Sequence, residues 1–390
     1  MAGKSWSVAG AARYAREARI STAAYLQTAP IARELRQFKL TRAYEIHLAS
    51  VRRHEAALDL LLGGLGYRRP YPAGWHATAE LLTSDEARVL AGADLYVISP
   101  QMCDVVVAAA QSLTRDDLPL LAEDDLPSPT GLLVLPHPLL VTSVGGDLGD
   151  HRAFSWHTPA HFNVPDPLAP DRVRGLPAVR IAIYHDTHGP VRPDSFLDLA
   201  ARARREGTPL PPLLPAGERC LEFQTQRADD PQGAQQLARA AQAVDGAYRQ
   251  SAEVMGQNED RVIGEYTSGS PIDDADDSFA WRFLYAFWRL CEQRIGGVEP
   301  VETSHAARVV AERTGLSPEV RVIQLRRRAE HAPGEPLTRN WQHRWVVRMH
   351  KVRQWYSTEQ RHKVIYRGPY IKGPDGKPLL GGETVRALVR

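Results

Sequence analysis

The stretch that decides the fold is a strongly apolar segment in the last third of the chain. It reads Ser278-Phe279-Ala280-Trp281-Arg282-Phe283-Leu284-Tyr285-Ala286-Phe287-Trp288-Arg289-Leu290-Cys291. Aromatic and aliphatic side chains surround most of the circumference of the helix that this pattern predicts, which runs to Ile295, and a helix that is apolar nearly all round is buried. We therefore expect this helix inside the hydrophobic core. The alternative is a set of aromatic rings that stacks on a cofactor.

Two acidic segments precede or separate predicted helices. Asp273-Asp274-Ala275-Asp276-Asp277 stands directly before the apolar helix, where the positive end of the helix dipole stabilises carboxylates. Residues 115–129 are acidic and contain prolines, a composition that predicts an exposed loop.

The amino-terminal third is predicted to be largely helical. Residues 5–62 contain strong helix formers, and apolar residues at steps of three and four predict one helix over 41–62. Thr83-Ser84-Asp85-Glu86 has the pattern of a capping box, so we expect a helix to begin at Thr83. Ser99-Pro100 is expected to begin the next helix.

The middle of the chain alternates between strand and loop signals. Apolar runs at 131–135 and 139–144 flank two prolines and predict a hairpin. Residues 145–178 carry two adjacent glycines and five prolines and are predicted to be rich in loops. Strict alternation predicts a strand over 179–184, and residues 219–224 show a weaker strand pattern.

Together these patterns predict an α+β fold with a helical N-terminal region, a mixed central region and a small basic antiparallel sheet at the C-terminus. Strand patterns at 320–327, 344–349 and 363–367 are expected to contribute to that sheet. The predicted regions are residues 1–114, which are helical, residues 131–295, a mixed α/β body that ends in the buried aromatic helix, and residues 318–390, a basic β-rich domain.

The composition is typical of a globular protein. Apolar residues make up 43% and charged residues 24% of 390 residues, which predicts one large domain or two to three smaller ones. Cys103, Cys220 and Cys291 are too few and too far apart for a disulfide framework or a paired-cysteine zinc motif, and they fit a reducing compartment. No apolar run reaches the ~20 residues of a membrane span, and the first residues lack an apolar signal core. We therefore expect a cytoplasmic protein without membrane contact.

The net charge of +2 conceals an uneven distribution. Residues 321–390 contain 16 Lys and Arg against 5 Asp and Glu, a net charge of +11, whereas residues 1–320 contain 32 against 41, a net charge of −9. A basic segment on an acidic body predicts a polyanionic partner for that segment. The alternative is that the two parts of the chain attract each other across an internal interface.

The basic segment is also rich in aromatic residues. Alternation over residues 344–348 would place Arg344 and Arg348 on one face of a strand and Trp345 on the other. Cations in such a position bind phosphates, and exposed aromatic rings stack on bases, although core packing is the alternative for the rings. The candidate binding residues are Arg344, Arg348, His350, Lys351, Arg353, Trp355, Tyr356, His362, Arg367 and Lys372.

One pattern points to an enzyme instead. Residues 184–188 place two histidines and a carboxylate at the end of a predicted strand. Imidazoles and carboxylates are metal ligands, so His185, Asp186 and His188 are candidate ligands of a metal-dependent hydrolase or nuclease. The alternative is a polar turn after a strand. His157 and His161 repeat the idea more weakly, because a proline lies between them.

Other catalytic signatures are absent from the sequence. It contains no phosphate-binding loop of the Walker type, no dinucleotide-binding glycine pattern and no Gly-x-Ser-x-Gly nucleophile motif. We therefore expect no cofactor and no catalytic residue, and we favour a binding protein over an enzyme.

The segment from Trp345 to Pro374 resembles the C-terminal segment of the second type V-A anti-CRISPR protein family and of related plasmid- and phage-borne bacterial proteins. The family pattern is Val-Arg-Gly-His-Trp-Arg, then a Trp/Tyr pair, then an Arg-rich strand that ends near Trp-x-x-Pro. The matching residues are Val347, Arg348, His350, Trp355, Tyr356 and Pro369, with Tyr366 in the place of the Trp. The departures are Met349, Lys351 and Val352, which replace the Gly, Trp and Arg of the pattern.

The resemblance extends upstream to the aromatic helix at 283–291, so that it covers about the last 110 residues in order. The strand end at 133–136, further upstream, also looks like that of the family. It implies a non-enzymatic inhibitor of mobile-element type. A member of that family binds the nascent amino-terminal peptide of the type V-A CRISPR effector nuclease, and the mRNA of the effector is then destroyed. For this chain the resemblance implies recognition of a polypeptide or of RNA, including RNA on a ribosome, through the body and the basic tail.

Overall fold

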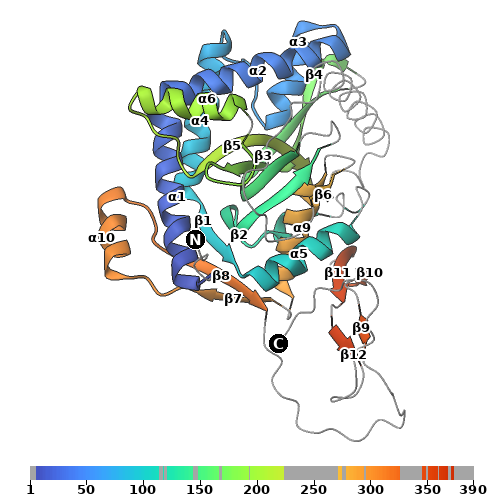
Figure 1. The fold of residues 1–390 in the computed structure, drawn as a ribbon. Helices are drawn as coiled ribbons and strands as arrows, with labels where there is room; N and C mark the ends of the chain where they lie inside the picture. The colour runs from blue at the N-terminus through green and yellow to red at the C-terminus, as the bar shows by residue number, and fades with distance from the viewer. Residues whose placement is uncertain are drawn as a thin grey trace, which may run out of the picture.

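A mixed β-sheet runs through the middle of the molecule (Figure 1). Its described strands are β1 (Asp94–Ile98), β2 (Thr130–Thr142), β3 (Leu148–Asp166), β4 (Ala169–Asp186), β5 (Leu213–Glu222), β6 (Ile272–Asp273), β7 (Gly296–Pro300) and β8 (Val320–Leu325). Their order is β5-β4-β3-β2-β1-β8-β7, and β6 pairs with β2. Strand β1 runs parallel to both β2 and β8, and β6 runs parallel to β2, whereas the other neighbours are antiparallel.

The structure is a computed structural model, and it describes most but not all of the chain. The described residues are 6–113, 117, 121–143, 148–166, 169–192, 194–223, 271–274, 278–293, 296–325, 345–347, 350–358, 360–367 and 370–372.

Helices cover both faces of the sheet. They are α1 (Val8–Thr28), α2 (Pro30–Val51), α3 (His54–Leu61), α4 (Trp75–Gly92), α5 (Pro100–Ser112), α6 (Asp194–Arg205), α9 (Phe279–Glu292) and α10 (His305–Thr314), with short 3-10 turns η1 (Gly63–Leu65) and η3 (Glu123–Asp125). One core cluster joins residues of α1, α2, α4 and α6 to the sheet, and a second joins α5 and α9 to its other face. No described helix is long and apolar enough to cross a membrane.

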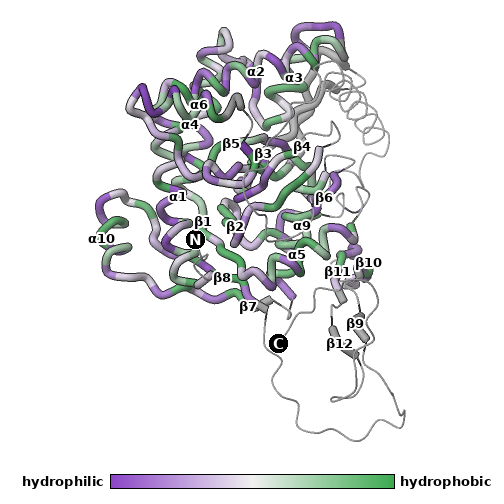
Figure 2. The backbone as a smooth tube through the Cα atoms, in the orientation of Figure 1, coloured by the Kyte–Doolittle hydropathy of each residue, from purple (hydrophilic) through white to green (hydrophobic). Residues whose placement is uncertain are grey.

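The central strands are apolar on both faces because each face meets a layer of helices. Leu95 and Val97 of β1 lie in the core cluster of α1 and α4, whereas Tyr96 and Ile98 lie in that of α5 and α9. Successive side chains of a strand point to opposite faces, so a strand between two layers needs a continuous apolar run. Figure 2 shows hydrophobic segments along the central strands, whereas the outer helix α6 is largely hydrophilic.

The apolar stretch that opened the analysis forms α9, and its role in the core is confirmed. Phe279, Phe283, Phe287 and Trp288 are fully buried, and they pack against α5 and the sheet. The acidic run before the helix caps it through Asp274, whose carboxylate accepts hydrogen bonds from the backbone N–H of Ser278 at 3.0 Å and of Phe279 at 2.9 Å. These contacts satisfy donors that a helix leaves open at its amino end.

Two predictions for the amino-terminal helices are wrong in their boundaries. The single helix expected over 41–62 is broken where Arg52 adopts a left-handed backbone conformation (φ 55°), so that α2 ends and α3 begins there. The capping box does not begin a helix, because α4 runs through it from Trp75. Thr83 is buried and its hydroxyl donates to the carbonyl of Ala79 at 2.9 Å instead. Tertiary packing overrides a local capping signal here.

The predicted hairpin at 131–144 is also wrong. Both apolar runs belong to one strand, β2, which pairs with β3 on either side of an irregularity between Val134 and Leu139. The two prolines cannot donate ladder hydrogen bonds, so they shift the register without reversing the chain. The region expected to be rich in loops, 145–178, mostly forms the long strands β3 and β4. The strand over 179–184 is confirmed as part of β4.

The C-terminal strands form two small antiparallel sheets, as the predicted α+β class requires. Strand β9 (Trp345–Val347) pairs with β12 (Tyr370–Lys372), and β10 (His350–Tyr356) forms a hairpin with β11 (Arg361–Arg367). They lie below α5 and α9 in Figure 1. The strand expected first in this group, β8, instead pairs with β1 in the central sheet.

We predict that Gly131→Ala strongly destabilises the fold. Gly131 pairs with Trp156 across β2 and β3, and a Cβ atom at Gly131 would lie 2.1 Å from the fully buried indole ring. Overpacking of this kind costs about 1–3 kcal/mol or more. The free energy of unfolding, measured by urea denaturation, should fall accordingly. Gly92→Ala is the matched control, because no described atom beyond the adjoining backbone of its own helix lies within 4 Å of the added methyl group. Equal stability of the two variants would contradict the prediction.

Candidate functional site

The C-terminal hairpin β10–β11 carries most of the predicted binding residues that the structure describes. Its strands pair in register from His350 opposite Arg367 to Tyr356 opposite Arg361. Val364 and Tyr366 are buried in the core cluster of α9, and Arg289 of α9 donates from Nε to the carbonyl oxygen of Val364 at 3.0 Å. The hairpin is therefore docked on the body by one face of β11.

Three cations of the hairpin, Lys351, Arg353 and Arg361, are paired with carboxylates of the same chain. Lys351 contacts Asp117, and Arg353 donates to Asp117 from Nη2 at 2.7 Å and from Nε at 3.2 Å. Arg361 contacts both carboxylate oxygens of Asp124 at 2.8–2.9 Å. These three cations therefore take part in an internal interface, which was the alternative to a polyanionic partner.

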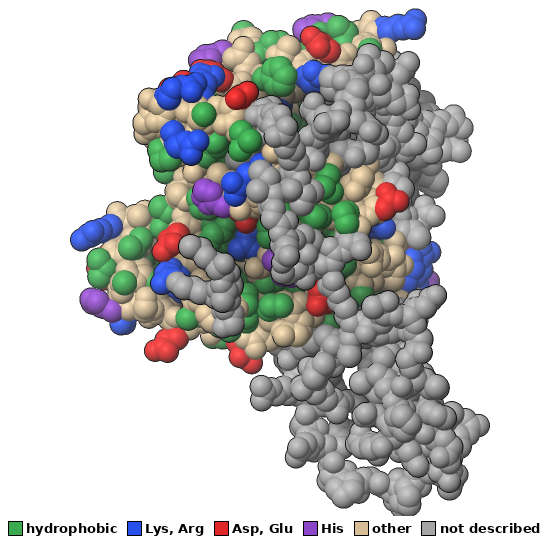
Figure 3. Space-filling model, in the orientation of Figure 1, with side chains coloured by type: hydrophobic (Ala, Val, Ile, Leu, Met, Phe, Trp, Pro, Cys, Tyr) green, Lys and Arg blue, Asp and Glu red, His purple; other side chains and the backbone are tan. Residues whose placement is uncertain are grey.

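Acidic residues between α5 and β2 receive the hairpin, and the prediction of an exposed loop at 115–129 is wrong for several of its described residues, although Glu123 and Asp124 are exposed. Asp117 and Leu121 have no exposed surface, and Asp125 is 1% exposed. Asp125 accepts a hydrogen bond from Nη1 of Arg289 at 2.6 Å. On the face that Figure 3 shows, blue and red side chains are interspersed over the described surface.

The tip of the hairpin is the part that stays open to solvent. The Trp355 side chain is 48% exposed, and its ring meets the exposed His362 edge to face at 5.0 Å between centroids. Lys363 lies over the Tyr356 ring at 5.5 Å. Trp355 is therefore not in the core, whereas Val364 and Tyr366 of β11 are.

The structure describes the other predicted binding residues in part or not at all. Arg344 and Arg348 lie outside the described residues. Of His350, Arg367 and Lys372 the structure describes the strand positions but not the side chains. Trp345 lies in β9, opposite Lys372 of β12.

The histidine pair at the end of β4 does not form a metal site in the described part of the chain. Nδ1 of His185 lies 2.9 Å from Oδ1 of the buried Asp150. Asp186 pairs with Nε of Arg152 at 3.3 Å and accepts the backbone N–H of His188 at 2.9 Å. Among the described residues, no three His, Cys, Asp or Glu side chains are arranged to hold a metal ion. The arrangement fits the polar turn better than the metal centre.

The weaker histidine pair is likewise not assembled. His157 contacts the hydroxyl of Thr130 through Nδ1 at 2.9 Å, and the side chain of His161 lies outside the described residues.

A buried charged cluster, which the sequence analysis missed, lies between the helices α2 and α4 and the strands β4 and β5. Arg36 of α2 contacts Glu86 of α4 and, through Nη1 at 2.6 Å, Glu218 of β5. Arg180 of β4 contacts Asp85. The side chains of these residues are 5–15% exposed.

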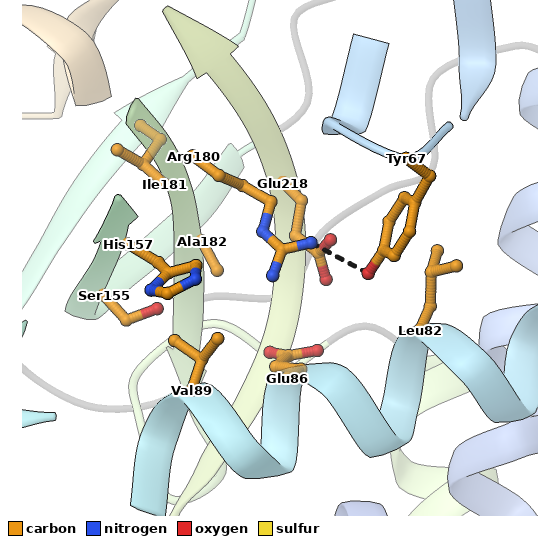
Figure 4. Close-up of a pocket in the computed structure, with 10 residues that line it drawn as sticks. All are labelled: Tyr67, Leu82, Glu86, Val89, Ser155, His157, Arg180, Ile181, Ala182 and Glu218. Atoms are coloured by element: carbon orange, nitrogen blue, oxygen red, sulfur yellow. Dashed lines mark hydrogen bonds between the residues drawn. The ribbon is translucent and has the colours of Figure 1, made fainter. Parts of the chain in front are cut away.

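Tyr67 completes the cluster beside a cavity of about 10 Å³, enough for a single water molecule. Its hydroxyl accepts a hydrogen bond from Nη1 of Arg180 at 2.8 Å and donates to Asp85 at 2.9 Å. Figure 4 shows Glu86 and Glu218 pointing into the same space from opposite sides. The cavity is too small for an organic substrate, so the cluster binds the layers together and is not a catalytic pocket.

The balance of charge in this cluster favours a retained proton. Arg36 is the direct contact of both Glu86 and Glu218, whereas Asp85 is shared by Arg180 and Arg88. Burial and the neighbouring Glu218, opposed by Arg36, raise the pKa of Glu86 to about 7. Burial acts on Glu218 as well, but Arg36 and Arg180 outweigh it and lower the pKa of Glu218. The pair therefore keeps one proton at a pH where an ordinary glutamate is ionised.

The sequence held one signal for the cluster. Arg180 interrupts the apolar face of a predicted strand, and a charge at such a position needs a buried partner. That partner, Asp85, lies within a local capping-box pattern, which gives no sign of a distant contact.

We predict that Asp117→Ala loosens the hairpin. The change leaves Lys351 and Arg353 without the carboxylate that holds them, while the apolar contacts of Val364 remain. Both cations are partly exposed, so we expect a moderate effect, about a tenfold faster hydrogen exchange of the β10 amides, or about 1.4 kcal/mol. Asp124→Ala, which removes a 68% exposed carboxylate, should change exchange much less. If hydrogen exchange of the β10 amides is unchanged in Asp117→Ala, Asp117 does not hold the hairpin on the body.

We predict that Glu86→Gln removes a pH dependence of stability. With a pKa of about 7 when folded and 4.5 as the ordinary value, Glu86 contributes stability fully below pH 4.5 and loses it as the pH rises through 7. The free energy of unfolding of the parent protein, minus that of Glu86→Gln, should fall by up to about 3 kcal/mol from pH 4.5 to 7.5. Contributions of groups that do not interact with Glu86 cancel in this difference.

Glu80→Gln is the control for the pH series, because Glu80 lies exposed on the same helix. A difference between the parent protein and Glu86→Gln that stays flat with pH would show that Glu86 is ionised throughout.

Comparison of the chain with protein-family models, with curated proteins and with solved structures finds no match. The case for a function therefore stands on the residues and their geometry.

Proposed function

We propose that this chain is a non-enzymatic binding protein that holds a polypeptide on the tip of its C-terminal hairpin. The observation that carries the proposal is the exposure of Trp355. Its side chain is 48% exposed on a hairpin whose other end is fixed to the body. A large aromatic side chain on a fixed support is the usual anchor of a protein interface.

The surroundings of Trp355 suit a peptide. His362 supports the indole ring from the opposite strand, and Arg353 is 50% exposed although it is paired with Asp117. An apolar anchor between an imidazole and a paired guanidinium offers a hydrophobic contact with a polar rim.

A polypeptide is favoured over RNA because of the paired cations. RNA binding draws its affinity from Lys and Arg that neutralise phosphates. Lys351, Arg353 and Arg361 already contact carboxylates of the same molecule. An RNA backbone would have to displace Asp117, which has no exposed surface.

The resemblance of this segment to the second type V-A anti-CRISPR protein family supports the same proposal. Trp355 and Tyr356 stand at the Trp/Tyr pair of the family pattern. In this proposal the chain is a cytoplasmic inhibitor of mobile-element type, and its ligand is a nascent polypeptide presented on a ribosome.

We predict that Trp355→Ala abolishes peptide binding without unfolding the protein. The test selects peptides from a random display library against the parent protein and measures their affinity by fluorescence anisotropy. Loss of an aromatic anchor costs about 2 kcal/mol or more, so the dissociation constant should rise about thirtyfold. An unstructured RNA oligomer, titrated at low and high salt, tests the RNA alternative.

Phe38→Ala is the matched control, because Phe38 is the most exposed large apolar residue described, at 64%, and lies on α2 away from the hairpin. It should leave peptide affinity unchanged. Selected peptides that bind Trp355→Ala as tightly as the parent protein would overturn the proposal, as would tighter, salt-dependent binding of RNA.

A further inference from the structure

Residues 40–82 form a helical lobe with an apolar core of its own. The lobe consists of the second half of α2, the helix α3, the turn η1 and the first half of α4, and α2 and α3 lie at the top of Figure 1. The described residues packed around this core all lie within 40–82, and its buried members are Leu40, Leu61, Leu62, Ala79 and Leu82. The other halves of α2 and α4 belong to the core cluster on the sheet, through Ile31, Ala32, Ala87 and Leu90.

The buried ion pair of Arg36 with Glu86 lies at the boundary between these two apolar clusters. On α2, Arg36 stands one turn after Ala32 of the sheet cluster and one turn before Leu40 of the lobe. On α4, Glu86 stands one turn after Leu82 of the lobe. Both helices therefore change from one core to the other at a charged residue.

Polar contacts fasten the two helices and the lobe to the strands at this boundary. Arg36 reaches Glu218 of β5 through Nη1 at 2.6 Å, and Lys39 donates from Nζ to two carbonyl oxygens of β5 at 2.8 and 3.2 Å. Arg180 of β4 donates to the hydroxyl of Tyr67, which lies in the lobe, at 2.8 Å. Figure 4 shows these strand residues facing α4 across the small cavity.

The geometry of Glu86 and Glu218 requires a proton between them. Their side chains are 5% and 6% exposed, and Arg36 is the direct contact of both. The two carboxyl groups also lie close enough to hydrogen-bond to each other. Ionised carboxylates only accept hydrogen bonds, so one member of the pair keeps its proton. Loss of that proton leaves two buried negative charges in contact, and they repel each other strongly where water is scarce.

We propose that the helical lobe is a lid, which stays closed on the sheet while the Glu86–Glu218 pair holds its proton and opens when the pair loses it. The repulsion acts between α4 and β5, at the boundary where the apolar core is already divided. A change of charge at the contact of two packed elements is a common trigger of such a switch. The opening is local, because the two larger core clusters contain the sheet. The lid does not depend on the function proposed for the hairpin tip.

Glu86 sets the direction of the pH dependence. Its pKa is about 7 in the closed state, against an ordinary value of 4.5. Glu86 therefore favours the closed lid fully below pH 4.5, and this contribution is lost as the pH rises through 7. The groups that face Glu86 from the elements around it are Arg36 and Lys39 on α2, Asp85 on α4, Tyr67 after η1, His157 on β3, Arg180 and Tyr184 on β4, and Glu218 on β5.

His157 is the other group among these that titrates between pH 5 and pH 7. Burial and then Arg180 lower its pKa, so protonation of His157 favours the open lid and acts with the opposite sign. Desolvation of the Lys39 ammonium group and the neighbouring Arg36 lower the pKa of Lys39 to about 8. Burial opposes ionisation of Asp85, but Arg180 outweighs it and brings the pKa of Asp85 to about 2. A pH series from 5 to 7 therefore separates Glu86 from its neighbours.

Hydrogen exchange followed by mass spectrometry over this pH range tests the lid, after correction for the intrinsic exchange rate. Amides of residues 40–82 in the parent protein should exchange at least tenfold faster at pH 7 than at pH 5, with about fortyfold as the limit set by the two pKa values of Glu86. Amides of β1 and β2 should not change. Glu86→Gln removes the titration, so the exchange of its lobe should be independent of pH. Glu80→Gln, exposed on the same helix, should behave like the parent protein.

Thermal unfolding shows whether each variant is folded, and Glu218→Gln replaces Glu86→Gln if the latter does not fold, because it removes the other member of the pair. The proposal is overturned if exchange of the lobe does not rise with pH in the parent protein, or if it rises equally in Glu86→Gln. Exchange that rises equally in the lobe and in β1 and β2 would show global unfolding in place of a lid. Exchange that falls with pH would assign the titration to His157, and either result overturns the proposal as well.

Discussion

The buried guanidinium of Arg289 is the interaction on which the join between body and C-terminal hairpin depends. Arg289 is 2% exposed, although it lies in the aromatic helix α9, most of whose residues are buried. It donates to the carbonyl oxygen of Val364, to Asp125 and to Glu292. A buried charge is tolerated only with such partners. One side chain therefore fixes three segments: α9, the acidic turn η3 and strand β11.

The contacts between the hairpin and the body change how the uneven distribution of charge along the chain is interpreted. A net charge of +11 over residues 321–390 suggests a surface that attracts polyanions. The described cations of the hairpin instead meet Asp117 and Asp124, so part of the charge is neutralised inside the molecule. What the hairpin then offers to a partner is the exposed ring of Trp355 more than a field of positive charge. Net charge counted along a segment is thus a poor measure of the charge that the folded surface presents.

The sequence predicted what depends on local pattern and missed what depends on distant pairing. The periodicity of α9 and the alternation in β4 identify these elements, because burial imposes the period of each. The partner of Arg289, Asp125, lies 164 residues away, and that of Arg353 lies 236 residues away. No local pattern encodes such pairs. Glu86 shows the opposite failure, because a local capping pattern fitted a residue whose real partner is Arg36 of another helix.

The two buried charge clusters differ in how they accommodate their carboxyl groups. At Arg289, the buried Asp125 also lies within 4.0 Å of Arg361 and Lys363, and Glu292 is 38% exposed. On the other face of the sheet, Arg88 and Arg180 share Asp85, and Arg36 is the direct contact of both Glu86 and Glu218, whose side chains are 5% and 6% exposed. Solvent hardly reaches that pair, and a retained proton relieves the repulsion of its two carboxylates. The supply of cations and the access to water together therefore decide which face of the sheet responds to pH near neutrality.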